Sequence, residues 1–198
     1  GFDYEDGGMQ MPTSIFNAAN LIMEAANNHV PGYFGLTAGA AHLLISYASE
    51  EIKQTYVPKM VEMKWGGTMC LTEPQAGSDL GVLRAKAEPN ADGTYNISGQ
   101  KIFITWGDHD CAENIVHLVL ARLPDAPSGS KGISLFLCPK YFVNKNGSLG
   151  GRNTFKAISL EHKLGIHGSP TCVMDFDNAK GWLVGEPNRG LACMFTMM

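Results

Sequence analysis

The sequence has no apolar run close to the ~20 residues that a membrane-spanning helix needs. It also has little net charge, because 15 Lys and Arg residues stand against 19 Asp and Glu residues for a formal charge of −4. A chain with this balance has no strong attraction for polyanions, so nucleic acid is not expected as a partner. No internal repeat or low-complexity segment is present.

Cysteine is sparse, and its spacing is irregular. The five residues are Cys70, Cys111, Cys138, Cys172 and Cys193, and no two of them form a C-x-x-C pair. An odd number without such spacing argues against a zinc site and against a disulfide framework. Four of the five stand in apolar runs, where Cys behaves as a small buried hydrophobic residue. We therefore expect a reducing compartment and predict a cytoplasmic location.

Apolar residues are plentiful, at 44% of the chain, which is enough for the core of one large domain or two small ones. Helical spacing of these residues predicts three helices near the N-terminus. The first follows Pro12 and ends near Asn27, the second covers about residues 36–47, and the third starts at Ser49. Pro58 is expected to kink or restart the third helix.

The pattern changes from helical to extended at Gly66 and Gly67. Short apolar segments follow at 68–72, 84–88, 94–98, 100–105, 115–121, 132–138 and 171–176. They do not alternate with helices, which argues against a doubly wound α/β sheet and favours an antiparallel barrel or sandwich. Residues 139–160 are expected to form a long polar excursion. The predicted fold class is α+β, with an antiparallel β-barrel after the helices.

One segment, Met69-Cys70-Leu71-Thr72-Glu73-Pro74-Gln75-Ala76-Gly77-Ser78-Asp79, organises the rest. It is typical of a short strand that ends in a sharp turn. Pro74 fixes its own φ, Gly77 can adopt a positive φ, and Thr72 and Ser78 place hydroxyls on either side. Such a turn can leave backbone N–H groups free to bind a ligand. A strand followed by an ordinary polar turn accounts for the same residues.

Three segments carry a family resemblance. Thr72-Glu73-Pro74 with Ala76-Gly77-Ser78-Asp79 resembles the signature of the flavin-dependent acyl-CoA dehydrogenases. Ser98–Thr105 resembles that family's second flavin segment, and Lys163–Thr171 resembles its third signature. The three occur in the family's order, and the resemblance covers essentially the whole chain. It is closest to the branch that contains 3-methylmercaptopropionyl-CoA dehydrogenase.

The resemblance implies a division of the chain. Residues 1–65 would be the end of an N-terminal helical domain, residues 66–185 a middle β-domain, and residues 186–198 the start of a C-terminal helical domain. The apolar run from Gly190 to Met198 reads as the first turns of a buried helix. We therefore expect the chain to be a piece of a larger protein.

The resemblance also implies FAD as the cofactor. The matching residues are Met69, Leu71, Thr72, Gly77, Ser78, Phe103, Ile104 and Thr105. Thr105 would donate to flavin N5, and Phe103, in place of the family's usual Trp, would pack on the ring. Ser78 would contact flavin or the substrate. Without the family, residues 102–105 read as a buried strand.

Several other residues have no assigned role. Trp106 either closes one side of an acyl pocket or is plain core. Arg84 and Lys86 are candidates for CoA phosphates, although a solvated strand edge accounts for them better. Asp108-His109-Asp110 has no third ligand at metal spacing, so no metal site is assigned. His167 replaces a frequent Arg of the third signature, which puts that residue's contacts in doubt.

The predicted function is that of an FAD-dependent acyl-CoA dehydrogenase fragment. The intact enzyme would desaturate an acyl-CoA substrate between Cα and Cβ and pass electrons to an electron-transfer flavoprotein. It would be a homo-oligomer, a dimer or a tetramer. The family's catalytic base is a Glu in or near the C-terminal bundle, and nothing here matches it, so no catalytic residue is assigned. The alternatives are a flavin acyl-CoA oxidase and a non-enzymatic β-barrel binding module that uses the 69–79 turn.

Overall fold

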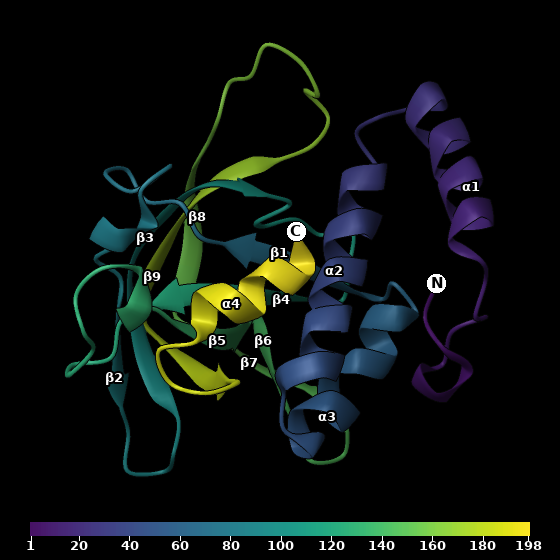
Figure 1. The fold of residues 1–198 in the computed structure, drawn as a ribbon. Coiled ribbons are helices and arrows are strands. Elements are labelled where there is room, and N and C mark those ends of the chain that lie inside the picture. Colours follow the sequence, from purple (N-terminus) through teal and green to yellow (C-terminus); the bar gives the residue numbers. More distant parts are fainter.

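The computed structural model describes residues 1–198, with helices on one side of a twisted sheet (Figure 1). Three helices open the chain: α1 (Thr13–Ala26), α2 (Pro31–Tyr47) and α3 (Glu50–Val61). The prediction of three helices is confirmed. Helix α2 starts earlier than expected because Pro31 occupies its first turn, where a missing N–H costs nothing. Helix α3 continues past Pro58 to Val61.

Helix α2 packs closely against strand β1 (Trp65–Cys70). Thr37 Oγ1 accepts a hydrogen bond from Gly67 N at 3.1 Å, so the helix and the strand backbone touch directly. A Cβ added to Gly67 would lie 2.5 Å from the Ala40 Cβ, which shows why this position requires glycine. The small residues of α2 therefore permit close contact, here with the sheet.

A seven-stranded sheet forms the rest of the core. Its order is β1-β4-β5-β9-β3-β2, and β8 pairs with β9. The further strands are β2 (Lys86–Pro89), β3 (Tyr95–Thr105), β4 (Asn114–Ala121), β5 (Ser134–Pro139), β8 (Phe155–Leu160) and β9 (Thr171–Val184). Strands β1 and β4 pair in parallel, and the other pairs are antiparallel.

The predicted antiparallel barrel is not confirmed. The strands at the two ends of the order, β1 and β2, do not pair, and the sheet is mixed. The parallel pair forms because the chain leaves β1, builds the β2–β3 hairpin, and returns to β1 through β4. A connection of that length can carry the chain back to the starting end of β1, so that β4 runs in the same direction, whereas a short hairpin turn can only produce an antiparallel pair. The α+β class is confirmed.

The polar segment expected at 139–160 contains three short strands that the sequence pattern did not predict. Strands β6 (Tyr141–Val143) and β7 (Leu149–Arg152) form a small two-stranded sheet, and β8 follows. The turn between β6 and β7 is polar and contains Gly147 with a φ of +80°. Its Asn and Gly residues dominated the sequence pattern and concealed the short strands beside them.

A single core cluster joins the helices to the sheet and includes Leu44, Met60, Leu118 and Phe136. Helix α1, by contrast, buries no residue. The short helix α4 (Gly190–Met194) lies across the sheet beside α2 and packs on β5 (Figure 1). None of the helices combines the length and hydropathy needed to cross a bilayer.

Candidate functional site

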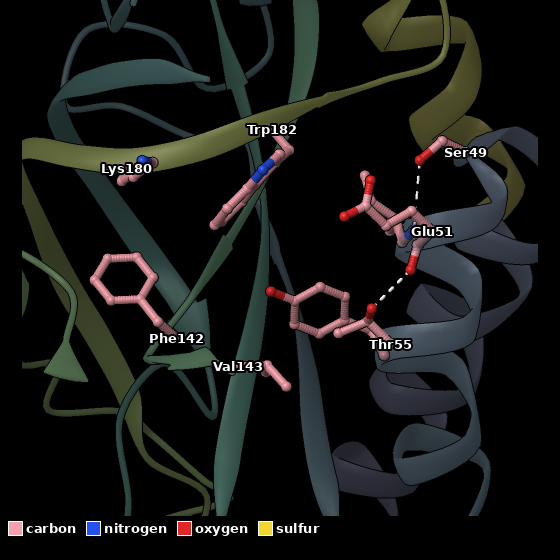
Figure 2. Close-up of a pocket in the computed structure, with 9 residues that line it drawn as sticks. Ser49, Glu51, Thr55, Phe142, Val143, Lys180 and Trp182 are labelled. Carbon is pink, nitrogen blue, oxygen red and sulfur yellow. Dashed lines mark hydrogen bonds between the residues drawn. The ribbon is translucent and has the colours of Figure 1, made fainter. Parts of the chain in front are cut away.

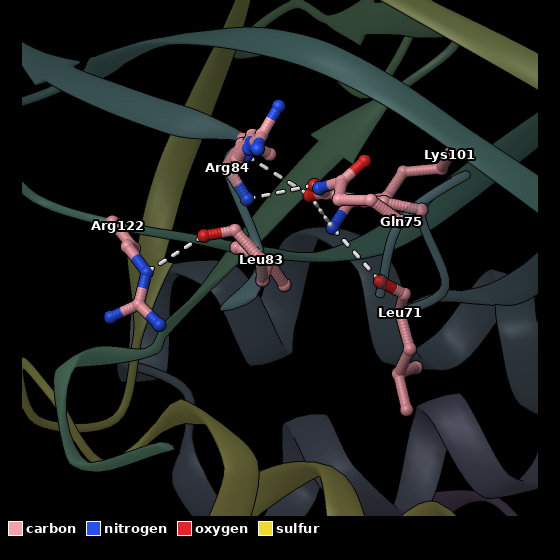
Figure 3. A network of polar contacts seen from close by, with 8 residues as sticks. Leu71, Gln75, Leu83, Arg84, Lys101 and Arg122 are labelled. Atoms are coloured by element: carbon pink, nitrogen blue, oxygen red, sulfur yellow. Dashed lines mark hydrogen bonds and ion pairs between the residues drawn. The ribbon is translucent and has the colours of Figure 1, made fainter. Parts of the chain in front are cut away.

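The first and second motifs lie side by side. Ile102 N donates to Thr72 O at 2.9 Å, and Lys101 Nζ donates to Leu71 O at 3.0 Å. Figure 3 shows the Lys101 side chain reaching toward Leu71 and the neighbouring polar groups. Two segments that are about thirty residues apart in sequence therefore lie side by side, as the family resemblance of both segments predicts.

Glu73 organises the turn of the first motif. Its side chain is 3% exposed and accepts hydrogen bonds from Gln75 Nε2, Arg84 N and Ala85 N at 2.6, 2.7 and 3.0 Å. Its backbone N–H and C=O also pair with Ala76 at 3.0 Å each way, which closes the turn. Glu73 therefore has a structural role, because it binds the backbone on both sides of the turn.

Lys101 completes this network as a fully buried cation. Its Nζ lies 2.8 Å from Glu73 Oε1, with both side chains almost inaccessible to water. Burial lowers the pKa of Lys101, and the Glu73 carboxylate opposes that shift. Burial alone raises the pKa of Glu73, but Lys101 and the two backbone donors outweigh it and hold it below its usual value. The sequence reasoning missed Lys101, although a lone Lys in an otherwise apolar strand was a usable signal.

Phe103 occupies a bulge in β3, where the register with β9 shifts between Lys101 and Ile104. Its φ is +59°, a left-handed value that is costly for a residue with a Cβ. The bulge turns the Phe103 ring outward, leaving it 59% exposed, and buries Ile104 to 2%. Bulges of this kind often lie beside functional sites, where they redirect a side chain.

The hydroxyls of Thr72, Ser78 and Thr105 make no hydrogen bond within the chain and are not sealed from solvent. Gly77 and Ser78 are exposed on the turn, and Met69, Thr72 and Thr105 are half-buried. Leu71 and Ile104 are buried, so only their backbone could face a ligand. The predicted residues thus provide unpaired hydroxyls and one outward-facing aromatic ring.

The third motif meets the end of the second. Trp106 N donates to Pro170 O at 2.7 Å, and Glu161 N donates to Thr171 O at 2.8 Å. The loop between β8 and β9 arches away from the sheet (Figure 1) and exposes His167. Gly168 N donates to His29 Nδ1 at 3.2 Å, which fixes the loop near the start of α2.

Arg84 and Lys86 line a surface pocket of about 530 Å³ together with Arg122. The Arg122 guanidinium is fully engaged, since it donates to Leu83 O at 2.8 Å (Figure 3) and to Gly81 O at 2.6 Å, and also to two further carbonyls. Arg84 and Lys86 are exposed, and their side chains form no ion pair. These two are the cations available to an anionic ligand.

Asp108 forms ion pairs with two basic side chains. Its carboxylate lies 2.6 Å from Lys140 Nζ and 3.1 Å from Arg152 Nη2. Burial alone raises the pKa of Asp108, but these two cations outweigh it and lower the pKa. The Asp108-His109-Asp110 segment is therefore held by ion pairs in the structure.

A second pocket, of about 390 Å³, lies between α3 and the β6 and β9 strands (Figure 2). Trp182 and Phe142 form its sheet side, and Glu51 and Thr55 form its helix side. None of the three motifs contributes a residue to it. It is separate from the surface formed by the first two motifs.

Comparison with known proteins matches residues 68–179 to the family described as acyl-CoA dehydrogenase, middle domain. The chain is 53% identical over 194 residues to 3-methylmercaptopropionyl-CoA dehydrogenase of Ruegeria pomeroyi, covering 98% of this chain and 33% of that protein. It is 45% identical over 194 residues to a butyryl-CoA dehydrogenase of Syntrophomonas wolfei, covering 93% of this chain and 32% of the relative.

Among solved structures, the acyl-CoA dehydrogenase from Geobacillus kaustophilus is similar, with a TM-score of 0.79 and 28% identity. The match covers 99% of this chain and 49% of that one. The chain spans about a third of the length of the curated relatives that it matches, at 33% and 32%. The three joined motifs, the α+β fold and the family match together show that this chain belongs to the acyl-CoA dehydrogenase family.

Proposed function

We propose that this chain is the flavin-binding part of an FAD-dependent acyl-CoA dehydrogenase. The observation that carries the proposal is the surface made by the first two motifs. These motifs provide three hydroxyls without partners in the chain, and a strained bulge holds an aromatic ring outward. Strain of this kind persists where the surrounding structure fixes it, and it is concentrated at ligand sites.

The residues fit an FAD. Phe103 would pack on a ring face, and Thr105 would donate its hydroxyl to N5. Thr72 and the backbone of Met69, Leu71 and Ile104 would lie along the ring edge. Gly77 would let the turn approach the cofactor closely. When bound, the flavin accepts a hydride, and the protein provides binding, orientation and electrostatics. We assign no catalytic base in this chain.

The substrate that we propose is an acyl-CoA. Ser78 is exposed with a free hydroxyl and would contact the thioester arm of the substrate. Arg84 and Lys86, on the surface pocket, would bind the CoA phosphates. The two curated relatives are named for different acyl groups, so family membership does not fix the acyl group. We propose an electron-transfer flavoprotein as electron acceptor and a homo-oligomeric enzyme.

We also propose that residues 1–65, 66–185 and 186–198 belong to an N-terminal helical, a middle β- and a C-terminal helical domain. All five Cys residues are free and four are buried, which supports our proposal of a reducing, cytoplasmic location.

The test uses the protein expressed from its complete gene. A bound flavin spectrum, and dye or electron-transfer flavoprotein reduction that depends on an acyl-CoA, are the expected results. A colourless protein that binds no added FAD would favour the binding-module alternative. Reduction of oxygen as fast as that of the dye would favour the oxidase alternative.

A further inference from the structure

Lys101 is completely buried, and none of the proposed flavin or substrate contacts uses it. A buried cation is costly unless it is paired and hydrogen-bonded. Lys101 meets this requirement with two acceptors, since its Nζ lies 2.8 Å from Glu73 Oε1 and donates to Leu71 O at 3.0 Å. Because the side chain has no exposed surface, Lys101 can act on a ligand only through the groups that it contacts.

The peptide unit between Leu71 and Thr72 is bonded at one end only. Its carbonyl oxygen, Leu71 O, accepts from Lys101 Nζ (Figure 3), whereas its N–H, on Thr72, makes no hydrogen bond within the chain. The two groups of a trans peptide point to opposite sides, so the Thr72 N–H points away from the buried ammonium. A backbone N–H without a partner in the chain needs one from water or from a ligand.

The backbone of Thr72 is held on both sides of this free N–H. Lys101 binds the carbonyl before it, and Thr72 O accepts from Ile102 N at 2.9 Å, which joins the next peptide to β3. The direction of the Thr72 N–H is therefore fixed before any ligand arrives. Thr72 is half-buried, and its hydroxyl is free as well, so the residue offers two hydrogen-bonding groups at the proposed flavin surface.

We infer that Lys101 is a positioning residue, which aligns and polarises the Leu71–Thr72 peptide so that the Thr72 N–H becomes a stronger donor to the bound flavin. Hydrogen bonds in a chain strengthen one another, and a cation on the carbonyl oxygen draws electron density away from the N–H. The Glu73 carboxylate favours the charged form of Lys101. The ion pair has no net charge at a distance, so the effect passes through Leu71 O. This role rests on the proposed function, because the acceptor is the flavin.

The experiment uses the protein expressed from its complete gene. The double variant Lys101→Met with Glu73→Gln removes the bond to Leu71 O without leaving an unpaired buried charge. We expect it to bind oxidised FAD about five-fold more weakly, the effect of losing one ordinary hydrogen bond. Reduced FAD carries more negative charge, and bonds to ionised acceptors are about twice as strong, so its binding should weaken about 25-fold. The remaining factor of about five lowers the two-electron potential of the flavin by about 20 mV.

A second ion pair provides the matched control, the double variant Lys140→Met with Asp108→Asn. Lys140 Nζ lies 2.6 Å from Asp108 Oδ1 and donates to His109 O at 2.7 Å, so it repeats the pattern of a carboxylate and a backbone carbonyl outside the first motif. This variant is expected to lose stability and to keep the FAD affinity and potential of the wild type. Changes of equal size in the two double variants would show that any lost ion pair has this effect, and would refute the role of Lys101.

The single variant Glu73→Gln separates the two members of the pair. It keeps the bond from Lys101 to Leu71 O, so it should bind FAD about five-fold more tightly than the double variant with Lys101→Met. Equal affinities would assign the effect to Glu73 and overturn the inference. So would a double variant whose affinity and potential both stay within about two-fold of the wild-type equilibrium constants.

Hydrogen exchange provides a readout that needs neither turnover nor a variant. FAD is expected to slow exchange of the Thr72 amide in the wild-type protein, because the bound N–H is occupied. An exchange rate that FAD leaves unchanged overturns the inference, even where the Lys101 variant does not fold. If the wild-type protein binds no added FAD, the proposed function fails. If it binds FAD and the variants bind it equally well, only the role of Lys101 fails.

Discussion

Replacing Phe103 by Gly tests whether the bulge stores strain for function. The left-handed φ of +59° costs a residue with a Cβ about 1–2 kcal/mol, which glycine does not incur. The ring is 59% exposed, so its removal forfeits less than half of the roughly 1.5–3 kcal/mol that full burial of a Phe side chain contributes. Glycine also adds about 0.5–1 kcal/mol of entropy to the unfolded chain.

These terms nearly cancel, so we expect Phe103→Gly to change the free energy of unfolding by less than about 1 kcal/mol. Ile104→Gly, one residue along the same strand, is the control. Ile104 is 2% exposed, and losing its buried side chain is expected to cost about 3 kcal/mol or more. Phe103→Val should cost about 1–2 kcal/mol, because a β-branched residue fits a left-handed φ poorly.

The assay is urea unfolding followed by far-ultraviolet circular dichroism, combined with FAD titration of the complete protein. We expect Phe103→Gly to keep its stability while its FAD affinity falls, because the variant lacks the ring that we propose packs on the cofactor. A loss of stability above about 2 kcal/mol would show that the exposed ring is structural and refute the strain argument. Unchanged FAD affinity would refute its role in cofactor binding.

Further predictions concern buried charges and hydroxyls. Lys101→Met should destabilise the fold by about 3–5 kcal/mol in urea unfolding, because it leaves Glu73 buried without its cation. The double variant with Glu73→Gln should recover part of that loss, and simple additivity would contradict the pairing. Thr105→Val should weaken FAD binding by roughly 0.5–1.5 kcal/mol in a fluorescence titration, and an unchanged affinity would contradict the contact with N5. Burial lowers the pKa of His117 to about 3, so the unfolded state binds the proton more readily. The free energy of unfolding should therefore fall as the pH drops below about 6.5, and His117→Phe should flatten this dependence unless another group causes it.

Local patterns predicted the helices well. Helix α1 begins after Pro12 and α3 begins after Ser49, whose side chain accepts from Ile52 N at 3.4 Å. Capping residues and apolar spacing act within a few residues of each other, so the sequence alone contains this information. The same holds for the turn at Glu73–Ala76, where Pro74 restricts the backbone.

The register and direction of the strands could not be predicted from local sequence. The predicted strands at 94–98 and 100–105 are one strand, β3, because its partner β9 continues past both and absorbs two register shifts. The parallel pairing of β1 with β4 joins segments almost fifty residues apart, such as Gly67 and Val116. Such pairings depend on where the intervening chain travels, which no short pattern encodes.

The candidate site likewise has features that the sequence predicts and features that only the tertiary structure decides. The three motifs indicated a flavin surface only through their family resemblance, because their residue types alone fit an ordinary polar turn and a buried strand. Only the tertiary structure brought Lys101 to Glu73, turned Phe103 outward at a left-handed φ, and left Trp106 and His109 without partners. The sequence determined which groups are present near the site, since composition and short spacing are written in it. The fold determined which of them are buried, paired or free, because desolvation and hydrogen bonding depend on neighbours that are remote along the chain.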